Sequence, residues 1–345
     1  GKRDIMGHKD FDVIGLGEIM LRLSPMGVDR ISTSETLEKH PGGSEFNVVS
    51  GVSILGLRTA VVSKLPNSQI GEYIKNKIRF HGVSDDYLIY DDTDARRVGI
   101  YYYESGAFPR KPSITYDRKN SSFSSIDLSE IDSKIYSATK VFHTSGITLA
   151  LNEKTRDTAI EMIKNFKKND TLISFDVNYR ANLWDEDTAY ETICKVLPYV
   201  DILFVSEETS RRMMKRTGTM EEIMRGYCEE FGMKIVACTN RIVKTPKCHS
   251  FNSTMYTHDD NKFYNGKTFD NIDVIDRIGS GDAYVAGALW GLISHGNPQI
   301  AVDFGNAMSA VKSTVVGDLP NTNYNEIERV VEINNSGIAG SELNR

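Results

Sequence analysis

The sequence contains few of the residues that mark disulfide-linked, zinc-binding or membrane-spanning proteins. Its 345 residues include only four cysteines, and these form no CxxC pair. Neither the cysteines nor the seven histidines have the spacing of a zinc site. No stretch reaches the ~18–20 uninterrupted apolar residues that a membrane span needs. These absences favour a cytoplasmic chain with reduced thiols and no membrane partner.

Positive charge is also in short supply. The chain has 41 lysines and arginines against 47 aspartates and glutamates, which gives a net charge of −6. It has no long basic run, so nucleic acid is not an expected partner. An anionic small molecule would need a few local arginines to overcome this mildly repulsive field.

A repeated alternation of strands and helices is present along most of the chain. Short apolar runs such as "TLISFDVNYR" alternate with amphipathic stretches such as "EKTRDTAIEMIKNFKKN". Short links between them predict parallel βαβ units. We therefore expect one α/β domain over residues 1–345, with a central, mostly parallel sheet flanked by helices. Residues 335–345 are expected to form a loose C-terminal tail.

The alternation is interrupted between residues 91 and 125. There, "RRVGIYYYESGAFPRKPSITYDRKNSSFS" has two arms rich in Tyr, Ile, Val and Thr around a Gly- and Pro-containing turn. This pattern predicts a β-hairpin. Residues 19–40 and 93–125 are expected to form a small antiparallel β lid. Its exposed edges and aromatic surface predict a homodimer through the lid, with larger assemblies also open.

A glycine turn followed by an aspartate carries the clearest chemical signal. In "DRIGSGDAYVAG", residues 276–287, the turn Gly279–Ser280–Gly281 precedes a predicted helix. Backbone N–H groups at such a turn attract an anion, and Asp282 could accept a proton from an attacking hydroxyl. Together they fit phosphoryl transfer to an alcohol. The alternative is an ordinary helix start in which Asp282 only interacts with the helix dipole.

Polar residues at strand ends predict where a ligand binds. Asp176, Asn178 and Arg180 follow one predicted strand, and Glu207 follows the next. Ligands of open α/β sheets bind outside the carboxyl ends of the strands. These four side chains are therefore expected to gather at one rim.

Three separated motifs resemble the ribokinase (phosphofructokinase B) family of carbohydrate kinases. They are "GLGEIMLRL", "GGSEFNVVSGVSILG" and "DRIGSGDAYVAGALWGL", which occur in the family's order over essentially the whole chain. The resemblance implies a ribokinase-like α/β fold and phosphorylation of a sugar, with ATP and Mg²⁺ as cofactors. It makes Asp282 the base and Gly279, Ser280 and Gly281 the anion hole.

A finer resemblance is to the 2-keto-3-deoxygluconate kinases within that family, through "RVGIYYYESG…SITYDRKNSS" and "FDVNYRANLW". It implies that Arg118 and Arg180 meet a substrate carboxylate, because arginine presents a planar fork for such a group. The alternatives are a solvated Arg118 and an Arg180 salt bridge with Asp176 or Asp185. The substrate residues implied by the resemblance are Gly42, Gly43, Asn47, Tyr101, Tyr116, Arg118, Arg180 and Asp318.

The nucleotide side departs from the family pattern. Ser206 stands where many members have Asn, and "VACTNRIVKTPKCHSFNSTMY" has no glycine where a glycine-rich loop is usual. The resemblance still places Ser206, Thr239 and Asn240 at the nucleotide together with Gly279 and Gly281, and Arg241 within reach of phosphates. Glu207 is the expected metal residue.

The expected reaction is ATP-dependent phosphorylation of 2-keto-3-deoxygluconate at its primary hydroxyl. One alternative is a kinase of the same fold for a neutral sugar such as fructose or ribose. Another is a non-catalytic sugar-acid sensor. A nicotinamide dehydrogenase is disfavoured because "GLGEIM" lacks the third glycine of G-x-G-x-x-G.

Overall fold

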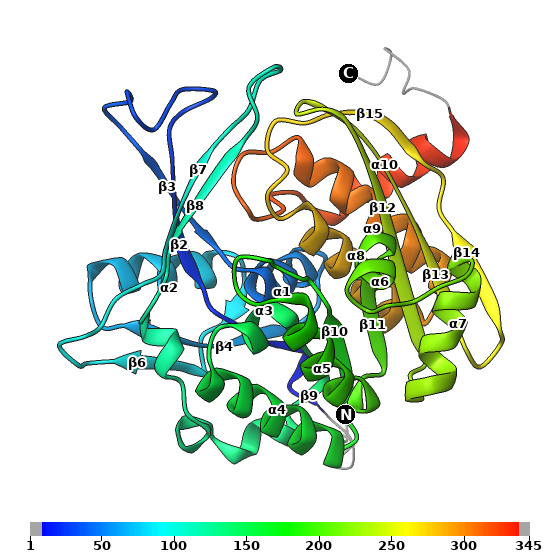
Figure 1. Cartoon of the computed structure of the whole chain (residues 1–345), viewed down its shortest axis with the longest axis horizontal. Helices are drawn as coiled ribbons and strands as arrows, with labels where there is room; N and C mark the ends of the chain where they lie inside the picture. Colours follow the sequence, from blue (N-terminus) through cyan, green and yellow to red (C-terminus); the bar gives the residue numbers. More distant parts are fainter. Residues whose placement is uncertain (1–8, 338–345) are drawn as a thin grey trace, which may run out of the picture.

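A large twisted sheet forms the body of the protein (Figure 1). The computed structural model describes residues 9–337 of the chain. The main path of the sheet runs β14-β13-β12-β11-β10-β9-β1-β4-β5, with β6 beside β4 and β15 beside β13. Its strands are β1 (Phe11–Leu16), β4 (Thr59–Pro66), β5 (Val83–Ser84), β6 (Leu88–Asp91), β9 (Thr139–Ser145), β10 (Leu172–Asp176), β11 (Ile202–Ser206), β12 (Ile235–Thr245), β13 (Cys248–Thr257), β14 (Lys262–Asn265) and β15 (Phe269–Asp273).

The strands from β5 to β12 pair in parallel, and the strands beyond β12 pair antiparallel. Helices cover both faces, and each face has its own buried apolar cluster. The helices are α1 (Ser44–Ile54), α2 (Gln69–Phe80), α3 (Gly146–Ala150), α4 (Glu153–Lys168), α5 (Glu186–Val196), α6 (Glu207–Arg212), α7 (Met220–Phe231), α8 (Ser280–His295), α9 (Pro298–Ser313) and α10 (Tyr324–Ser336). The expected α/β architecture is confirmed.

A second, smaller sheet rises from the body as the predicted lid (Figure 1). Its order is β3-β2-β7-β8, built from β2 (Met20–Ser24), β3 (Glu38–Gly42), β7 (Ile100–Glu104) and β8 (Ser113–Asp117). The pairs β2–β3 and β7–β8 are antiparallel, as expected for hairpins. The central pair β2–β7 is parallel, so the lid sheet is not antiparallel throughout as expected.

Local sequence signals account for the helix that leads to the site. In α1 the apolar residues Phe46, Val49 and Val52 are buried, and the chain reverses at Gly56, whose φ is 103°. Glycine adopts that conformation without strain, so Gly56 allows the chain to turn just after the helix ends.

The C-terminal boundary differs from the expectation. Helix α10 continues to Ser336; it is capped at its start by Asn323, whose Oδ1 accepts a hydrogen bond from the Glu326 N–H. Residues 335 and 336 are therefore helical, and the rest of the predicted tail lies outside the described residues from 338 onward. Among the helices of residues 9–337, none combines the length and apolar character that a membrane crossing requires.

Candidate active site

A cavity of about 1020 Å³ lies between the lid, the carboxyl ends of the parallel strands and the start of α8. All of the predicted site residues except Gly42 line it, although they come from segments far apart in the sequence. Those lining residues are Gly43, Asn47, Tyr101, Tyr116, Arg118, Arg180, Ser206, Glu207, Thr239, Asn240, Gly279, Ser280, Gly281, Asp282 and Asp318. The four strand-end residues Asp176, Asn178, Arg180 and Glu207 do gather at this rim.

Asp282 is held by two side chains of helix α1. Ser44 Oγ donates to Asp282 Oδ1 at 2.7 Å, and Asn47 Nδ2 donates to Asp282 Oδ2 at 3.0 Å. Burial raises the pKa of Asp282 to about 6, although these two hydrogen bonds lower it in part. A carboxylate with this pKa is ionised at neutral pH and is basic enough to take a proton. The Asn47 Oδ1 atom is buried without a hydrogen-bond partner among residues 9–337, which suits a ligand hydroxyl.

The turn before Asp282 requires glycine for two reasons. Gly279 has φ 84°, and a Cβ there would lie 2.0 Å from the Asp318 carbonyl oxygen. The Ser280 N–H is already used, because it donates to the Arg277 carbonyl at 3.1 Å. The amides of Gly281 and Asp282 donate to no other group of the described chain and remain for an anion. The turn therefore offers fewer free amides than its sequence indicated.

The second glycine turn carries the start of α1 close to the lid. A Cβ on Gly43 would lie 2.1 Å from the Glu18 carbonyl oxygen. A Cβ on Gly42 would lie 2.1 Å from Asp318 Oδ2, so Gly42 is needed for close packing although it does not line the cavity. Both glycines thus let α1 approach the segments that form the site.

Two further carboxyl groups lie beside Asp282 on the floor of the cleft. The pKa of Asp176 is raised to about 8, first by burial and then by the negative charge of Asp282, while Arg180 opposes the rise. Burial raises the pKa of Glu45 to about 7, against hydrogen bonds from Ser145 Oγ (2.6 Å) and Thr148 Oγ1 (2.7 Å). The floor is therefore acidic, and part of that acidity is neutralised by protons at pH 7.

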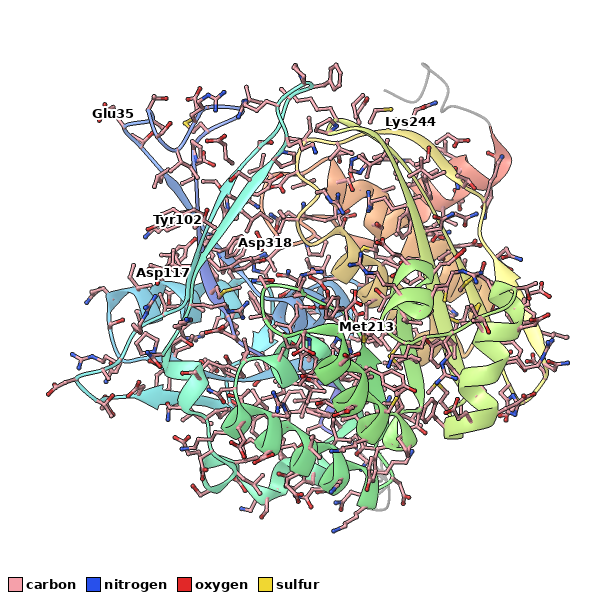
Figure 2. The ribbon with its side chains drawn as sticks, in the orientation of Figure 1. Glu35, Tyr102, Asp117, Met213, Lys244 and Asp318 are labelled. Atoms are coloured by element: carbon pink, nitrogen blue, oxygen red, sulfur yellow. The ribbon has the colours of Figure 1, made fainter. Side chains whose placement is uncertain are left out.

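Asp318 belongs to a buried charged network that joins the lid to the glycine turn. Arg22 on β2 forms ion pairs with Asp276 (Nη2–Oδ2, 2.7 Å) and Asp318 (Nη1–Oδ1, 3.0 Å), and all three side chains are only 3% exposed. Tyr101 donates its hydroxyl to Asp318 Oδ2. Both Asp318 oxygens thus have protein partners, and Tyr101 is buried in the lid together with Tyr103. Tyr102 lies on the other side of the lid strands from Asp318 (Figure 2).

The arginines of the cleft fall into two groups. Arg118 donates from Nε (3.0 Å) and Nη2 (2.7 Å) to Glu18 Oε1, so its solvated alternative is wrong. Arg180, Arg241 and Arg277 line the same cavity but form no ion pair with a carboxylate within residues 9–337. The alternative of an Arg180 salt bridge with Asp176 or Asp185 is therefore also wrong. Arg277 and Glu18 were not among the predicted site residues, although both lie within the quoted motifs.

The region expected to bind the nucleotide is a long hairpin, where the family pattern has a glycine-rich loop. Strands β12 and β13 are paired along their length, from Ile235 opposite Thr257 at one end to Thr245 opposite Cys248 at the other. Ser206 lies beside Thr239 in the β11–β12 register, and its Oγ caps α6 by accepting from the Thr209 N–H at 3.1 Å. Asn240 is exposed at the cavity edge.

Residues that could hold a metal ion are few. No group of three or more His, Cys, Asp or Glu side chains arranged for a metal occurs within residues 9–337. Glu207 is 44% exposed and lies 3.6 Å from Arg211. Mg²⁺ in nucleotide sites commonly takes one or two carboxylates and completes its shell with phosphate oxygens and water. Glu207 fits that requirement as a single carboxylate at the cavity wall.

The chain is similar to known proteins over nearly its whole length. Residues 10–322 match the model of the pfkB family carbohydrate kinases. A 2-dehydro-3-deoxygalactonokinase of Haloferax volcanii is 34% identical over 327 residues, which cover 95% of this chain and 98% of the relative. The crystal structure of 2-dehydro-3-deoxygluconokinase from Thermotoga maritima has a TM-score of 0.89 at 28% identity, over 94% of this chain and 99% of that chain.

A third protein shares the fold alone. A ribokinase II candidate from E. coli, solved in complex with ATP and Mg²⁺, has a TM-score of 0.80 at 19% identity, over 93% of this chain and 99% of that chain.

Proposed function

The chain belongs to the pfkB family of carbohydrate kinases, and from that premise we propose that it phosphorylates 2-keto-3-deoxygluconate at its primary hydroxyl with ATP. The product would be 2-keto-3-deoxy-6-phosphogluconate. The observation that carries the proposal is the Asp282 carboxylate, fixed by Ser44 and Asn47 beside a glycine turn with free amides. Relatives that act on the 3-deoxy-2-keto acids of galactonate and gluconate support the substrate class.

Each group has a distinct task in the proposed reaction. Asp282 accepts the proton of the primary hydroxyl while that oxygen forms the new bond to the γ-phosphorus. The bond from the γ-phosphorus to the β–γ bridging oxygen breaks, and ADP leaves with its electron pair. The amides of Gly281 and Asp282 stabilise charge on the transferred group.

The remaining groups position the ligands. Asn47 Oδ1 accepts from a sugar hydroxyl, and Arg180 pairs with the sugar carboxylate. Mg²⁺, when bound with ATP, offsets phosphate charge, and Glu207 would hold it. The lid carrying Tyr101 and Tyr116 excludes water, which would otherwise compete as an acceptor.

A neutral-sugar kinase is the second candidate, and one observation favours it. Glu18 already binds the Arg118 guanidinium at 2.7 Å, so only one of the two arginines expected at the carboxylate is unpaired. A sugar such as fructose or ribose requires hydroxyl partners and no guanidinium pair.

Release of ADP from MgATP by the purified protein distinguishes the candidates. We expect turnover with 2-keto-3-deoxygluconate or its galactonate epimer, and none with fructose, ribose or adenosine. The isomeric 5-keto-2-deoxy acid tests whether the carboxylate alone suffices. Turnover confined to a neutral sugar would overturn the substrate assignment. Tight binding of an acid without turnover would identify a sensor.

Asp282→Asn provides the matched test of the base. The variant should lower kcat by about 10²–10⁴-fold, because the proton acceptor is removed while Ser44 and Asn47 remain. In the wild-type protein, kcat/KM should fall as the pH drops through about 6, because protonated Asp282 cannot accept a proton. Asp187→Asn is the control, since Asp187 is 87% exposed and lies outside the cavity. Retained activity in Asp282→Asn would remove Asp282 from this role.

We also propose that a second copy of the chain covers the lid in a cytoplasmic homodimer. Strand β8 is a free edge whose residues are all exposed. Phe108 at the β7–β8 turn is 79% exposed, and Met26 in the β2–β3 connection is 59% exposed. Unpaired edges with apolar side chains are usually covered by another chain. A reaction that consumes ATP, and free cysteines at 194, 228, 238 and 248, fit the cytoplasm.

A further inference from the structure

Arg241 is a cation surrounded by neutral partners. It lies on β12, and its face of that strand lines the cavity with Thr239 and Val243. Its Nη2 donates to Ser280 Oγ (2.9 Å) and Ser309 Oγ (3.1 Å), and its Nη1 lies 3.0 Å from His249 Nδ1. Burial and the charge of Arg241 lower the pKa of His249 to about 4, so the ring is neutral and accepts that hydrogen bond.

The charge of Arg241 has no counter-charge within the described chain. Its guanidinium lies 5.1 Å from the centre of the Phe251 ring, its cross-strand neighbour, and near Arg277. Burial lowers the pKa of Arg241 to about 10, and Arg277 lowers it further. Placing two guanidinium groups together without an acid costs free energy, which a bound anion would offset. The pair therefore indicates an anion site.

The cleft could bind two anions, the carboxylate of the sugar acid and the phosphoryl group of ATP, and the position of Arg241 indicates which of them it contacts. Arg180 lies close enough to Asp282 and Asp176 to lower the pKa of both carboxyls, which places it beside the acceptor hydroxyl. Arg241 instead binds Ser280, the first residue of α8, next to the free amides of Gly281 and Asp282 in the first turn of that helix. Arg180 is thus on the side of the sugar acid, and Arg241 is on the side of the transferred group.

We propose that Arg241, anchored to the glycine turn through the Ser280 hydroxyl, binds the γ-phosphoryl group of ATP and stabilises it during transfer. The inference rests on the proposed kinase function and adds a catalytic residue to it. A guanidinium fork can engage two phosphoryl oxygens at once, and it supplies from a side chain what a glycine-rich loop supplies from its amides. The hydroxyl of Ser280 acquires a role through this contact, as a positioning group for Arg241.

Binding measurements with adenosine, AMP, ADP and MgATP test the assignment without turnover. Arg241→Ala should weaken binding of MgATP at least about 10-fold, and change the affinities for adenosine, AMP and ADP less than about 3-fold, because only ATP carries the γ-phosphoryl group. Equal losses for ADP and ATP, or no loss for ATP, would overturn the assignment. Lys244→Ala is the control, since Lys244 lies on the same strand, outside the cavity and far from Asp318 (Figure 2).

Turnover by the same variants provides the second arm. Arg241→Ala should lower kcat by about 10²–10³-fold, the usual loss on removing one donor to a developing anion, and leave the KM of the sugar acid unchanged. Arg180→Ala should show the reverse pattern, with a raised KM for the sugar acid and little change in kcat. Ser280→Ala, which removes the anchor and keeps the guanidinium, should lower kcat less than Arg241→Ala does. A raised sugar-acid KM in Arg241→Ala would assign Arg241 to the carboxylate instead.

Two further outcomes distinguish a loss of folding and a wrong overall function from a wrong role for Arg241. If Arg241→Ala lowers Tm beyond the control, Arg241→Lys keeps the charge; it should retain ATP binding and still lose kcat, because the fork is absent. A wild-type protein that neither binds ATP nor phosphorylates any acceptor would refute the proposed function itself. A fully active Arg241→Ala variant of an active kinase would refute only the role of Arg241.

Discussion

At the scale of single residues, the floor of the cleft holds carboxyl groups whose ionisation lowers the free energy of unfolding. Asp176, Glu45 and Asp282 all have raised pKa values, with burial as the first cause in each case. A raised pKa means that the folded protein disfavours the charged carboxylate relative to the unfolded chain. The fold therefore loses stability at this site in exchange for a polar, reactive cleft.

Asp176→Asn should stabilise the protein in a pH-dependent way. The pKa of Asp176 rises from 3.8 to about 8 on folding, so its contribution to the free energy of unfolding falls as the pH rises from about 4 to about 8. Asparagine does not ionise and escapes that loss. We expect a gain of about 1–3 kcal/mol in urea denaturation at pH 8 and almost none at pH 4.

The exposed Asp187→Asn variant should show no such pH dependence. An equal effect of Asp176→Asn at both pH values would mean that its carboxyl is not desolvated in the native state.

Residue pairings were the part of the site that the sequence could not predict. Arg118 was expected at the substrate, but Glu18, 100 positions earlier in the chain, binds it. Arg22 was not expected at the site, because nothing local in "MLRLS" signals Asp276 or Asp318 as its partners. Such ion pairs depend on how the lid meets the body, and that is set by packing over the whole chain.

At the scale of elements, helices α8 and α9 pack at unusually short distance. A Cβ on Gly287 would lie 2.6 Å from the Phe304 carbonyl oxygen, and a Cβ on Gly291 would lie 2.5 Å from the Ala301 Cα. These two glycines lie one turn apart on α8, on the face that meets the backbone of α9. The contact fixes the direction of α8, and with it the position of Asp282 at its first turn.

Gly291→Ala should destabilise the protein by about 1–3 kcal/mol, because the added methyl group overpacks the α8–α9 contact. Gly226→Ala is a matched control within helix α7. A Cβ there meets no atom within 4 Å, so alanine should stabilise the protein by about 0.5–1 kcal/mol through helix propensity. Urea denaturation measures both. Opposite signs are expected, and two stabilising substitutions would mean that α8 and α9 can separate at no cost.

The predicted elements were accurate where a local signal existed. Helix α2 begins after Ser68, whose Oγ accepts from the Gly71 N–H, and the chain turns at Gly82 with φ 74°. The β12–β13 hairpin was not predicted, because the family pattern has a glycine-rich loop in this region. Its exposed residues from Ile242 to Lys244 follow no amphipathic pattern, so periodicity could not reveal the hairpin's length.

At the scale of the whole molecule, the lid is both a cover for the cleft and the proposed dimer surface. Phe108→Asp should convert a dimer into a monomer, because it places a charge at the apolar tip of the lid. Phe80→Asp is the matched control: Phe80 is 77% exposed, but it lies at the end of α2. Light scattering after gel filtration measures the mass of each variant. A monomeric wild-type protein, or dissociation by Phe80→Asp alone, would contradict the lid interface.

The unpaired guanidinium groups of Arg180, Arg241 and Arg277 also decide how an anion reaches the protein. The chain as a whole carries a net charge of −6 and repels an anionic ligand from a distance. At physiological ionic strength the Debye length is about 8 Å, so most of that repulsion is screened before contact. We therefore expect the capture rate to depend chiefly on the local potential of the cleft, whose lining brings the positive charges of Arg180, Arg241 and Arg277 together with its acidic floor.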